Sequence, residues 1–184
     1  MTSRGVTGRA MPLDQSFVGR TYPPTAPYEV GREKIREFAT AVRDLNPAYL
    51  DPEAAKALGH PDVIAPPTFP VIIAIPAAYQ AVEDPEFGLG KSWVVHGDQR
   101  FVYQRPMRAG DRIECVVKVE AIKSIAGSDM ITLVSDLRTV EGEQVCTAYG
   151  LFVVRPDTSD TSDTSDAESV GTAESTAEAK AGES

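Results

Sequence analysis

The chain has 184 residues, of which 42% are hydrophobic, and its formal net charge is −9. Residues 156–184 hold eight acidic residues and one lysine, so the rest of the chain is nearly neutral. A nearly neutral body excludes a surface built to bind nucleic acid or an anionic membrane. The length suggests one domain, and the longest apolar run, near residues 69–79, is too short to span a bilayer.

The two ends of the sequence differ from its middle. Residues 156–184 contain a threefold Thr-Ser-Asp repeat and no aromatic residue. Such a composition cannot bury enough apolar surface to order the chain. We therefore predict a flexible N-terminus over residues 1–11, a folded domain over 12–155 and a disordered acidic tail over 156–184. The first residues lack the apolar core of a signal peptide, and we expect a cytoplasmic protein.

The first predicted helix spans residues 32–42, where apolar side chains recur at helical spacing. Asn46-Pro47 is expected to end it, because the residue before a proline avoids the helical region. A second, short helix is expected over residues 51–59, with Asp51 as its cap.

A long apolar helix is predicted next. From Phe69 to Tyr79 every residue is apolar or proline, the pattern of a helix that is buried on all sides. Thr68 is expected to cap this helix, which runs to about Val82. The helix is foremost a core element, and the wall of an apolar channel is the alternative, which the sequence leaves open. The candidate lining residues are Ile72, Ile75 and Tyr79.

The second half of the domain predicts strands. Apolar and polar residues alternate along it, and turn sequences interrupt it. Cys115 and Cys146 fall in these runs, without metal-ligand spacing, and are expected to be small core residues. We predict an α+β fold in which an antiparallel meander forms a curved sheet that wraps around the apolar helix. The predicted strands cover residues 92–106, 111–124, 129–140 and 143–155.

Two stretches carry a family resemblance. Residues 38–69 read FATAVRDLNPAYLDPEAAKALGHPDVIAPPTF, and residues 96–113 read HGDQRFVYQRPMRAGDRI. Both resemble the MaoC-like (R)-specific enoyl-thioester hydratase and (3R)-hydroxyacyl-ACP dehydratase family. The resemblance implies a single hot-dog fold that acts on an acyl-CoA or acyl-ACP, without a metal or another cofactor.

The first stretch resembles the catalytic loop of that family. Asp44 matches the family's acid and Asn46 its positioning amide, while Tyr49 stands where the family has a histidine base. A phenol with an ordinary pKa of about 10 stays protonated at neutral pH. The resemblance therefore points to the non-catalytic, substrate-binding subunit, which relies on a hot-dog partner that supplies Asp and His. Read from the residues alone, the same loop is a helix end, a turn and a core aromatic residue.

His96 is the backup candidate for the missing base. It lies in a predicted strand beside Gly97, which would let a ligand approach the backbone closely. The alternative is an ordinary strand residue with a satisfied hydrogen bond. The candidate substrate-binding residues are, in chain order, Asp44, Asn46, Tyr49, Pro67, Thr68, Ile72, Ile75, Tyr79, His96 and Gly97.

Three functions remain open at this point. The first is a dehydratase or hydratase subunit that binds the acyl chain, as a homodimer or as a heterodimer with a catalytic MaoC-like subunit. The second is a self-sufficient hydratase that uses Asp44 with His96, or a thioesterase. The third is a non-enzymatic acyl-binding module. The open sheet edge of a single hot-dog unit favours pairing with another such unit.

Overall fold

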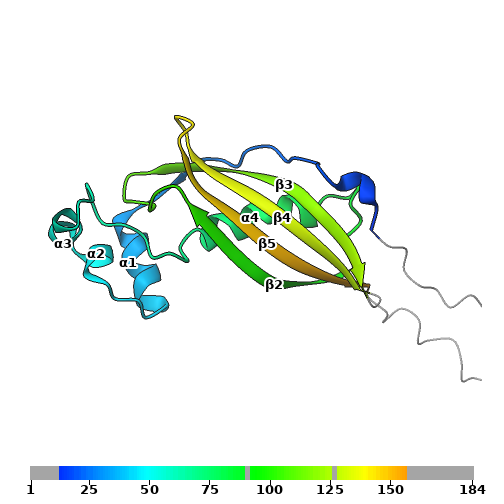
Figure 1. Ribbon diagram of the computed structural model, residues 1–184, viewed down its shortest axis with the longest axis horizontal. Helices are drawn as coiled ribbons and strands as arrows, with labels where there is room; N and C mark the ends of the chain where they lie inside the picture. Colours follow the sequence, from blue (N-terminus) through cyan, green and yellow to red (C-terminus); the bar gives the residue numbers. More distant parts are fainter. Residues whose placement is uncertain (1–12, 90–91, 126–127, 157–184) are drawn as a thin grey trace, which may run out of the picture.

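The computed structural model describes residues 13–89, 92–125 and 128–156. The N-terminus predicted over residues 1–11 and, apart from Pro156, the tail predicted over 156–184 lie outside these ranges. A five-stranded antiparallel sheet curls around one helix, α4, and three shorter helices lie beyond one end of the sheet (Figure 1). The predicted curved sheet around an apolar helix is confirmed.

The elements follow one another in a simple order. A 3-10 turn and a two-residue strand precede the helices, and the four long strands come last. Their bounds are η1 (Gln15–Phe17), β1 (Tyr28–Glu29), α1 (Arg32–Ala41), α2 (Pro47–Leu50), α3 (Pro52–Ala57), α4 (Val71–Val82), β2 (Ser92–Tyr103), β3 (Arg112–Ile125), β4 (Ser128–Thr139) and β5 (Gln144–Pro156).

The strand order in the sheet is β1-β3-β4-β5-β2. Strands β3 to β5 form the predicted meander, but β2 does not pair with the strand that follows it. It crosses to the far edge and pairs with β5, from Ser92 opposite Pro156 to Tyr103 opposite Cys146. The meander prediction was therefore wrong for β2. At this edge β2 packs Val94 and Phe101 against the core.

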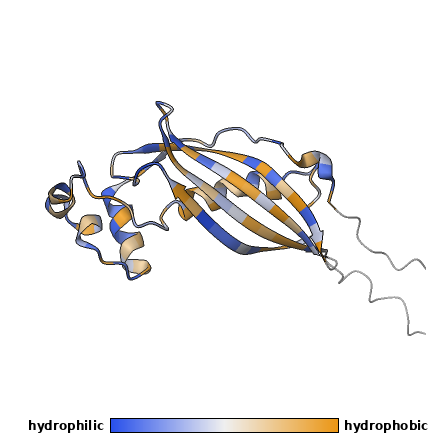
Figure 2. Ribbon diagram, in the orientation of Figure 1, coloured by the Kyte–Doolittle hydropathy of each residue, from blue (hydrophilic) through white to orange (hydrophobic). Residues whose placement is uncertain are grey.

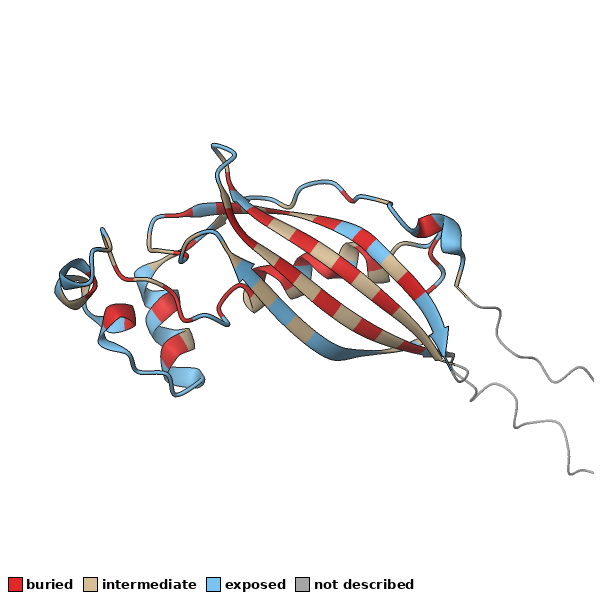
Figure 3. Ribbon diagram, in the orientation of Figure 1, coloured by how far each residue is buried: buried red, intermediate tan, exposed pale blue. Residues whose placement is uncertain are grey.

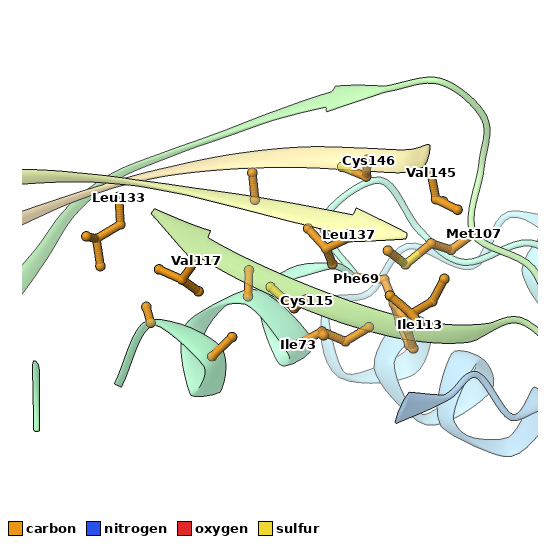
Figure 4. Close-up of a cluster of buried hydrophobic side chains, with 14 of the residues drawn as sticks. Phe69, Ile73, Met107, Ile113, Cys115, Val117, Leu133, Leu137, Val145 and Cys146 are labelled. Atoms are coloured by element: carbon orange, nitrogen blue, oxygen red, sulfur yellow. The ribbon is translucent and has the colours of Figure 1, made fainter. Parts of the chain in front are cut away.

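Alternation along the strands builds the core. In β3 the side chains of Ile113, Cys115, Val117 and Val119 are fully buried, and the residues between them are not. Figure 3 shows the same alternation across β3, β4 and β5. Cys115 and Cys146 are free, buried thiols, as predicted. Figure 4 shows them among the packed side chains of this core, which include Phe69, Met107 and Leu137.

Helix α4 begins later than predicted. Thr68 does not cap it; Pro70 precedes its first residue, and Thr68 only accepts a backbone hydrogen bond from Val71 at 3.1 Å. Pro70 already has a helical backbone (φ −58°), so the helix starts there without a side-chain cap. It continues through Pro76.

The prediction that α4 is buried on all sides was wrong. Its sheet-facing residues, such as Ile73 and Ala77, are buried, but the side chain of Tyr79 is 52% exposed and Pro76 is exposed. Figure 2 shows α4 as an apolar ribbon along the concave side of the sheet. The sheet of one chain therefore covers only part of this helix.

Helices α1 to α3, residues 32–57, form a helical lobe next to one end of the sheet (Figure 1). Helix α1 ends at Ala41, followed by Arg43 with a left-handed backbone (φ 59°). The prediction that Asn46-Pro47 ends α1 was wrong. Asn46 instead caps the start of α2, because Pro47 suits the first position of a helix. Asp51 caps α3 as predicted.

The turn after β2 anchors the lobe to the sheet. Arg105 donates to the buried carboxylate of Asp111 (2.7 Å) and to Glu143 (2.9 Å), so it ties the turn to the β4–β5 hairpin. The same turn accepts a backbone hydrogen bond from Ala65 at the carbonyl of Met107 (2.8 Å). The ion pair therefore fixes the segment that leads from the lobe into α4.

We predict that Asp111→Asn lowers the free energy of unfolding by about 3 kcal/mol, because it leaves the partly buried guanidinium of Arg105 without its buried counter-ion. Urea unfolding measures the change. Arg36→Ala is the control: it breaks an exposed pair with Glu33 on α1 and should cost at most about 0.5 kcal/mol. Equal effects of the two substitutions would contradict the structural role of Asp111.

Candidate functional site

The loop that resembles the family's catalytic loop lies in the helical lobe. Asp44 and Asn46 are exposed, and Asn46 uses its side-chain oxygen to accept a hydrogen bond from the backbone N–H of Ala48 (3.0 Å). Tyr49 follows on α2 and is only 8% exposed. The backbone therefore presents an acid and a phenol from one short turn-and-helix segment.

Tyr49 is poorly suited to accept a proton. Burial raises the pKa of its phenol, and the negative charge of Asp44 raises this pKa further. Both effects favour the neutral phenol. The described hydrogen bonds include none from the Tyr49 hydroxyl, and no buried side-chain polar atom of the described residues lacks a partner. The hydroxyl therefore reaches solvent at the edge of a buried ring.

Tyr103 joins Tyr49 from the sheet. It lies at the end of β2, and its hydroxyl donates to the carbonyl oxygen of Pro67 at 2.8 Å. Its pKa is raised, first by burial and then by the charges that Cys146 and Tyr49 would carry if ionised. Asp44, Tyr49, Pro67 and Tyr103 thus form one group, which we call the tyrosine site. Thr68, which is exposed, follows Pro67 directly.

A second group of predicted residues lines a pocket of about 150 Å³ between α4 and the edge of the sheet. Three predicted residues meet here: Ile75 and Tyr79 from α4, and His96 from β2. Val94 and Phe152 were not predicted to line a site, although both share the inward-facing register of their strands with His96. We call this cavity the edge pocket. Its lining residues are Ile75, Ala78, Tyr79, Val82, Val94, His96 and Phe152.

Ile72 does not belong to the edge pocket. It lines a separate apolar groove of about 270 Å³ between α4 and the segment before β1, with Thr25 and Tyr28 among its neighbours. The three helix residues predicted to line one channel therefore face two different cavities.

Gly97 forms a β-bulge rather than a place of close approach. The pairing of β2 with β5 shifts its register between His96 and Asp98. A Cβ at Gly97 would meet Val153 Cγ2 at 3.5 Å, an ordinary contact. The bulge lets His96 and Gln99, three positions apart, face the same side of the sheet.

His96 has the hydrogen-bond partner that the structural alternative expected. Its Nε2 lies 3.1 Å from Oε1 of Gln99, and its ring stacks on Phe152 with 5.3 Å between centroids. Seven residues of β2, roughly 23 Å at about 3.3 Å per residue, separate it from Tyr103 in the tyrosine site. One copy of the chain therefore does not bring His96 together with Asp44.

The described residues contain no cluster of three or more His, Cys, Asp or Glu side chains that could hold a metal ion. In the same ranges, no helix has the length and apolar character needed to cross a membrane.

Comparison with known proteins identifies the family. Residues 16–148 match the model of the family described as FAS1-like, dehydratase domain region. The chain belongs to this family. It is 63% identical over 145 residues to a UPF0336 protein of Streptomyces coelicolor, a match that covers 79% of this chain and 97% of the relative.

Solved structures extend this comparison. The chain is similar to the C-terminally truncated HadBC (3R-hydroxyacyl-ACP dehydratase) complex of Mycobacterium tuberculosis, with a TM-score of 0.67, 32% identity, and coverage of 74% of this chain and 96% of that one. A MaoC-like dehydratase gives a TM-score of 0.71 at 33% identity, and the match covers 77% of this chain and 43% of the dehydratase chain. The predicted hot-dog fold and the MaoC-like hydratase and dehydratase family are confirmed.

We predict that the phenol of Tyr49 ionises only above the ordinary tyrosine range, because burial and Asp44 both disfavour the phenolate. An ultraviolet absorbance titration of the folded protein and of Tyr49→Phe isolates its contribution by difference. Asp44→Asn should shift this difference curve toward lower pH, since it removes the second cause. A Tyr49 that ionises near neutral pH would contradict the assignment of a neutral phenol.

Proposed function

We propose that the chain is the acyl-binding subunit of a (3R)-hydroxyacyl-thioester dehydratase, or enoyl-thioester hydratase, whose hot-dog partner supplies the catalytic Asp and His. Tyr49 carries this proposal. It occupies the base position of the family's loop, and its surroundings hold it as a neutral phenol. A homodimer would contain two such loops and no base at either.

The free edge of β2 supports pairing with another hot-dog unit. Strand β2 spans residues 92–103 and pairs only with β5 among the described strands. Its outward side chains include Trp93, which is 69% exposed, and Val95, which is 57% exposed. A long strand edge flanked by exposed apolar residues favours association with a second edge.

The uncovered side of α4 adjoins that edge. Ile75 and Tyr79 from the helix meet Val94 and His96 from β2 in the edge pocket. A partner that pairs with β2 would therefore also cover this part of α4, and the pocket would lie close to the interface.

Antiparallel pairing of two β2 strands supports a binding role for this subunit and a catalytic role for its partner. It places the start of one β2 strand beside the end of the other. The end of β2, at Tyr103, lies with the tyrosine site, and the start lies next to the edge pocket. The partner's catalytic loop would then lie beside the edge pocket of this chain. A substrate held there would present its reacting carbons to the partner's base.

One compared structure supports the substrate class of this proposal. The HadBC complex is described as a 3R-hydroxyacyl-ACP dehydratase, and the match covers nearly all of the compared chain at 32% identity. Dehydration of a 3-hydroxyacyl thioester removes a proton from C2 and expels the hydroxyl group from C3. A histidine base and an acid perform such steps well, whereas a neutral phenol cannot accept the C2 proton.

We predict that the purified chain alone does not hydrate crotonyl-CoA. Adding a hot-dog partner with an intact Asp and His should raise the rate by roughly 100-fold or more over either protein alone, the range of general acid–base catalysis. The partner with its histidine replaced by alanine is the control and should give no increase. Full activity of the isolated chain would overturn the proposal and favour a self-sufficient hydratase.

A second prediction concerns the paired edge. Trp93→Glu should weaken association with the partner by about tenfold or more, because it puts a charge where a large apolar side chain is buried on pairing. Sedimentation analysis of the mixed proteins measures this. Ile125→Glu is matched in chemistry, since Ile125 is 54% exposed at the end of β3, three strands from β2 in the sheet. Equal weakening by both variants would argue against pairing through β2.

A further inference from the structure

The amide of Gln99 has a fixed orientation beside His96. Its Nε2 donates to the backbone carbonyl of Tyr149 at 3.0 Å. A carbonyl oxygen only accepts hydrogen bonds, so the amide nitrogen has to face Tyr149. Oε1 of Gln99 then faces His96, 3.1 Å from its Nε2.

This orientation selects one tautomer of His96. Because the amide oxygen is an acceptor only, Nε2 of His96 must carry the proton and donate it. In the neutral ring the lone pair then lies on Nδ1, and Nδ1 has no hydrogen bond to any described residue. The stacking on Phe152 holds the ring against the wall of the edge pocket.

The rest of the edge pocket is apolar. Aliphatic residues and Phe152 make up most of its lining, and only His96 and Tyr79 carry polar side-chain atoms there. Tyr79 is half exposed at the pocket's margin. His96 is exposed in the single chain, and a partner that pairs with β2 would cover it. Once water is excluded, a single oriented acceptor in an apolar wall distinguishes ligands by whether they bring a hydrogen-bond donor to it, because an unmatched polar group then costs free energy.

We propose that the edge pocket selects an acyl chain that carries a hydroxyl group beyond the reacting carbons, and that this hydroxyl donates to Nδ1 of His96. The inference rests on the proposed function, in which this pocket holds the acyl chain. His96 lies four residues, roughly 13 Å, from the start of β2, where edge pairing would bring the partner's catalytic loop. The recognised hydroxyl therefore lies well down the chain, away from C2 and C3. Gln99 is the positioning residue.

The test compares matched ligands on the full-length chain together with its catalytic partner. Calorimetry measures the dissociation constants of octanoyl, decanoyl and dodecanoyl pantetheine thioesters and of their ω-hydroxy counterparts. At the matching length, the hydroxylated ligand should bind about fivefold more tightly, the effect of one added hydrogen bond. His96→Phe keeps an aromatic ring on Phe152 and should lose this preference, while it binds the plain chains at least as well.

Two further variants separate the roles of the neighbouring groups. Gln99→Leu should reduce the preference although His96 remains, because neither nitrogen of the ring is then selected as the acceptor. Tyr79→Phe should keep the preference, since it removes only the other hydroxyl-binding group of the pocket. His96→Asn, which retains an acceptor, should restore part of the preference lost in His96→Phe.

The outcomes distinguish the two proposals. Equal binding of plain and hydroxylated chains by the unmodified protein, or a preference that survives His96→Phe or disappears in Tyr79→Phe, overturns the role of His96 and leaves the acyl-binding function intact. A His96→Phe variant that loses its partner rather than its ligand preference assigns the residue to the interface and overturns the inference. Failure of every acyl ligand to bind overturns both proposals.

Discussion

The apolar helix α4 needs cover on all sides, and one curled sheet covers only part of it. Ile73 and Ala77 pack beneath the sheet, whereas Ile75 and Tyr79 lie toward the free edge of β2. The uncovered helix surface and the unpaired strand edge adjoin, so one partner would satisfy both. The cost of an exposed apolar helix therefore favours subunit pairing, and in the proposed pairing a pocket of one subunit would lie beside the catalytic loop of the other.

The loop that carries Tyr49 keeps its shape through contacts that do not involve the side chain at position 49. Ile64 donates a backbone hydrogen bond to Ala48, and Ala65 donates to Met107 in the turn that Arg105 and Asp111 stabilise. Asn46 caps the short helix from the other side. These backbone contacts hold the segment independently of the group at the end of the side chain at position 49, and under the proposed function they keep the loop's geometry with a neutral phenol in place of a base.

Local patterns in the sequence predicted the parts of the fold that depend on local contacts. Alternation along β3, β4 and β5 gave three hairpin-connected strands, and Asp51-Pro52 marked the start of α3. The edge position of β2 depends on pairing with β5, some fifty residues later in the chain, and no pattern within β2 encodes it. Thr68 failed as a cap because Pro70 already begins the helix. The burial of α4 was overestimated because an apolar sequence reports what a helix needs and not how much cover one sheet provides.

The candidate site likewise combines residues that the sequence identified with residues that only distant contacts bring together. The resemblance located Asp44, Asn46 and Tyr49, but Tyr103 joins them only because β2 ends beside the lobe. The pairing of His96 with Gln99 depends on the bulge at Gly97, since residues three apart in a regular strand face opposite sides of a sheet. The bulge turns both side chains inward, and Gln99 then satisfies one ring nitrogen of His96 and not the other. His96 is exposed in the single chain, so its unpaired nitrogen would lose water only when a partner covers the edge of β2. In the proposed complex, Nδ1 would then favour a ligand that brings a donor to it over one that brings only methylene groups.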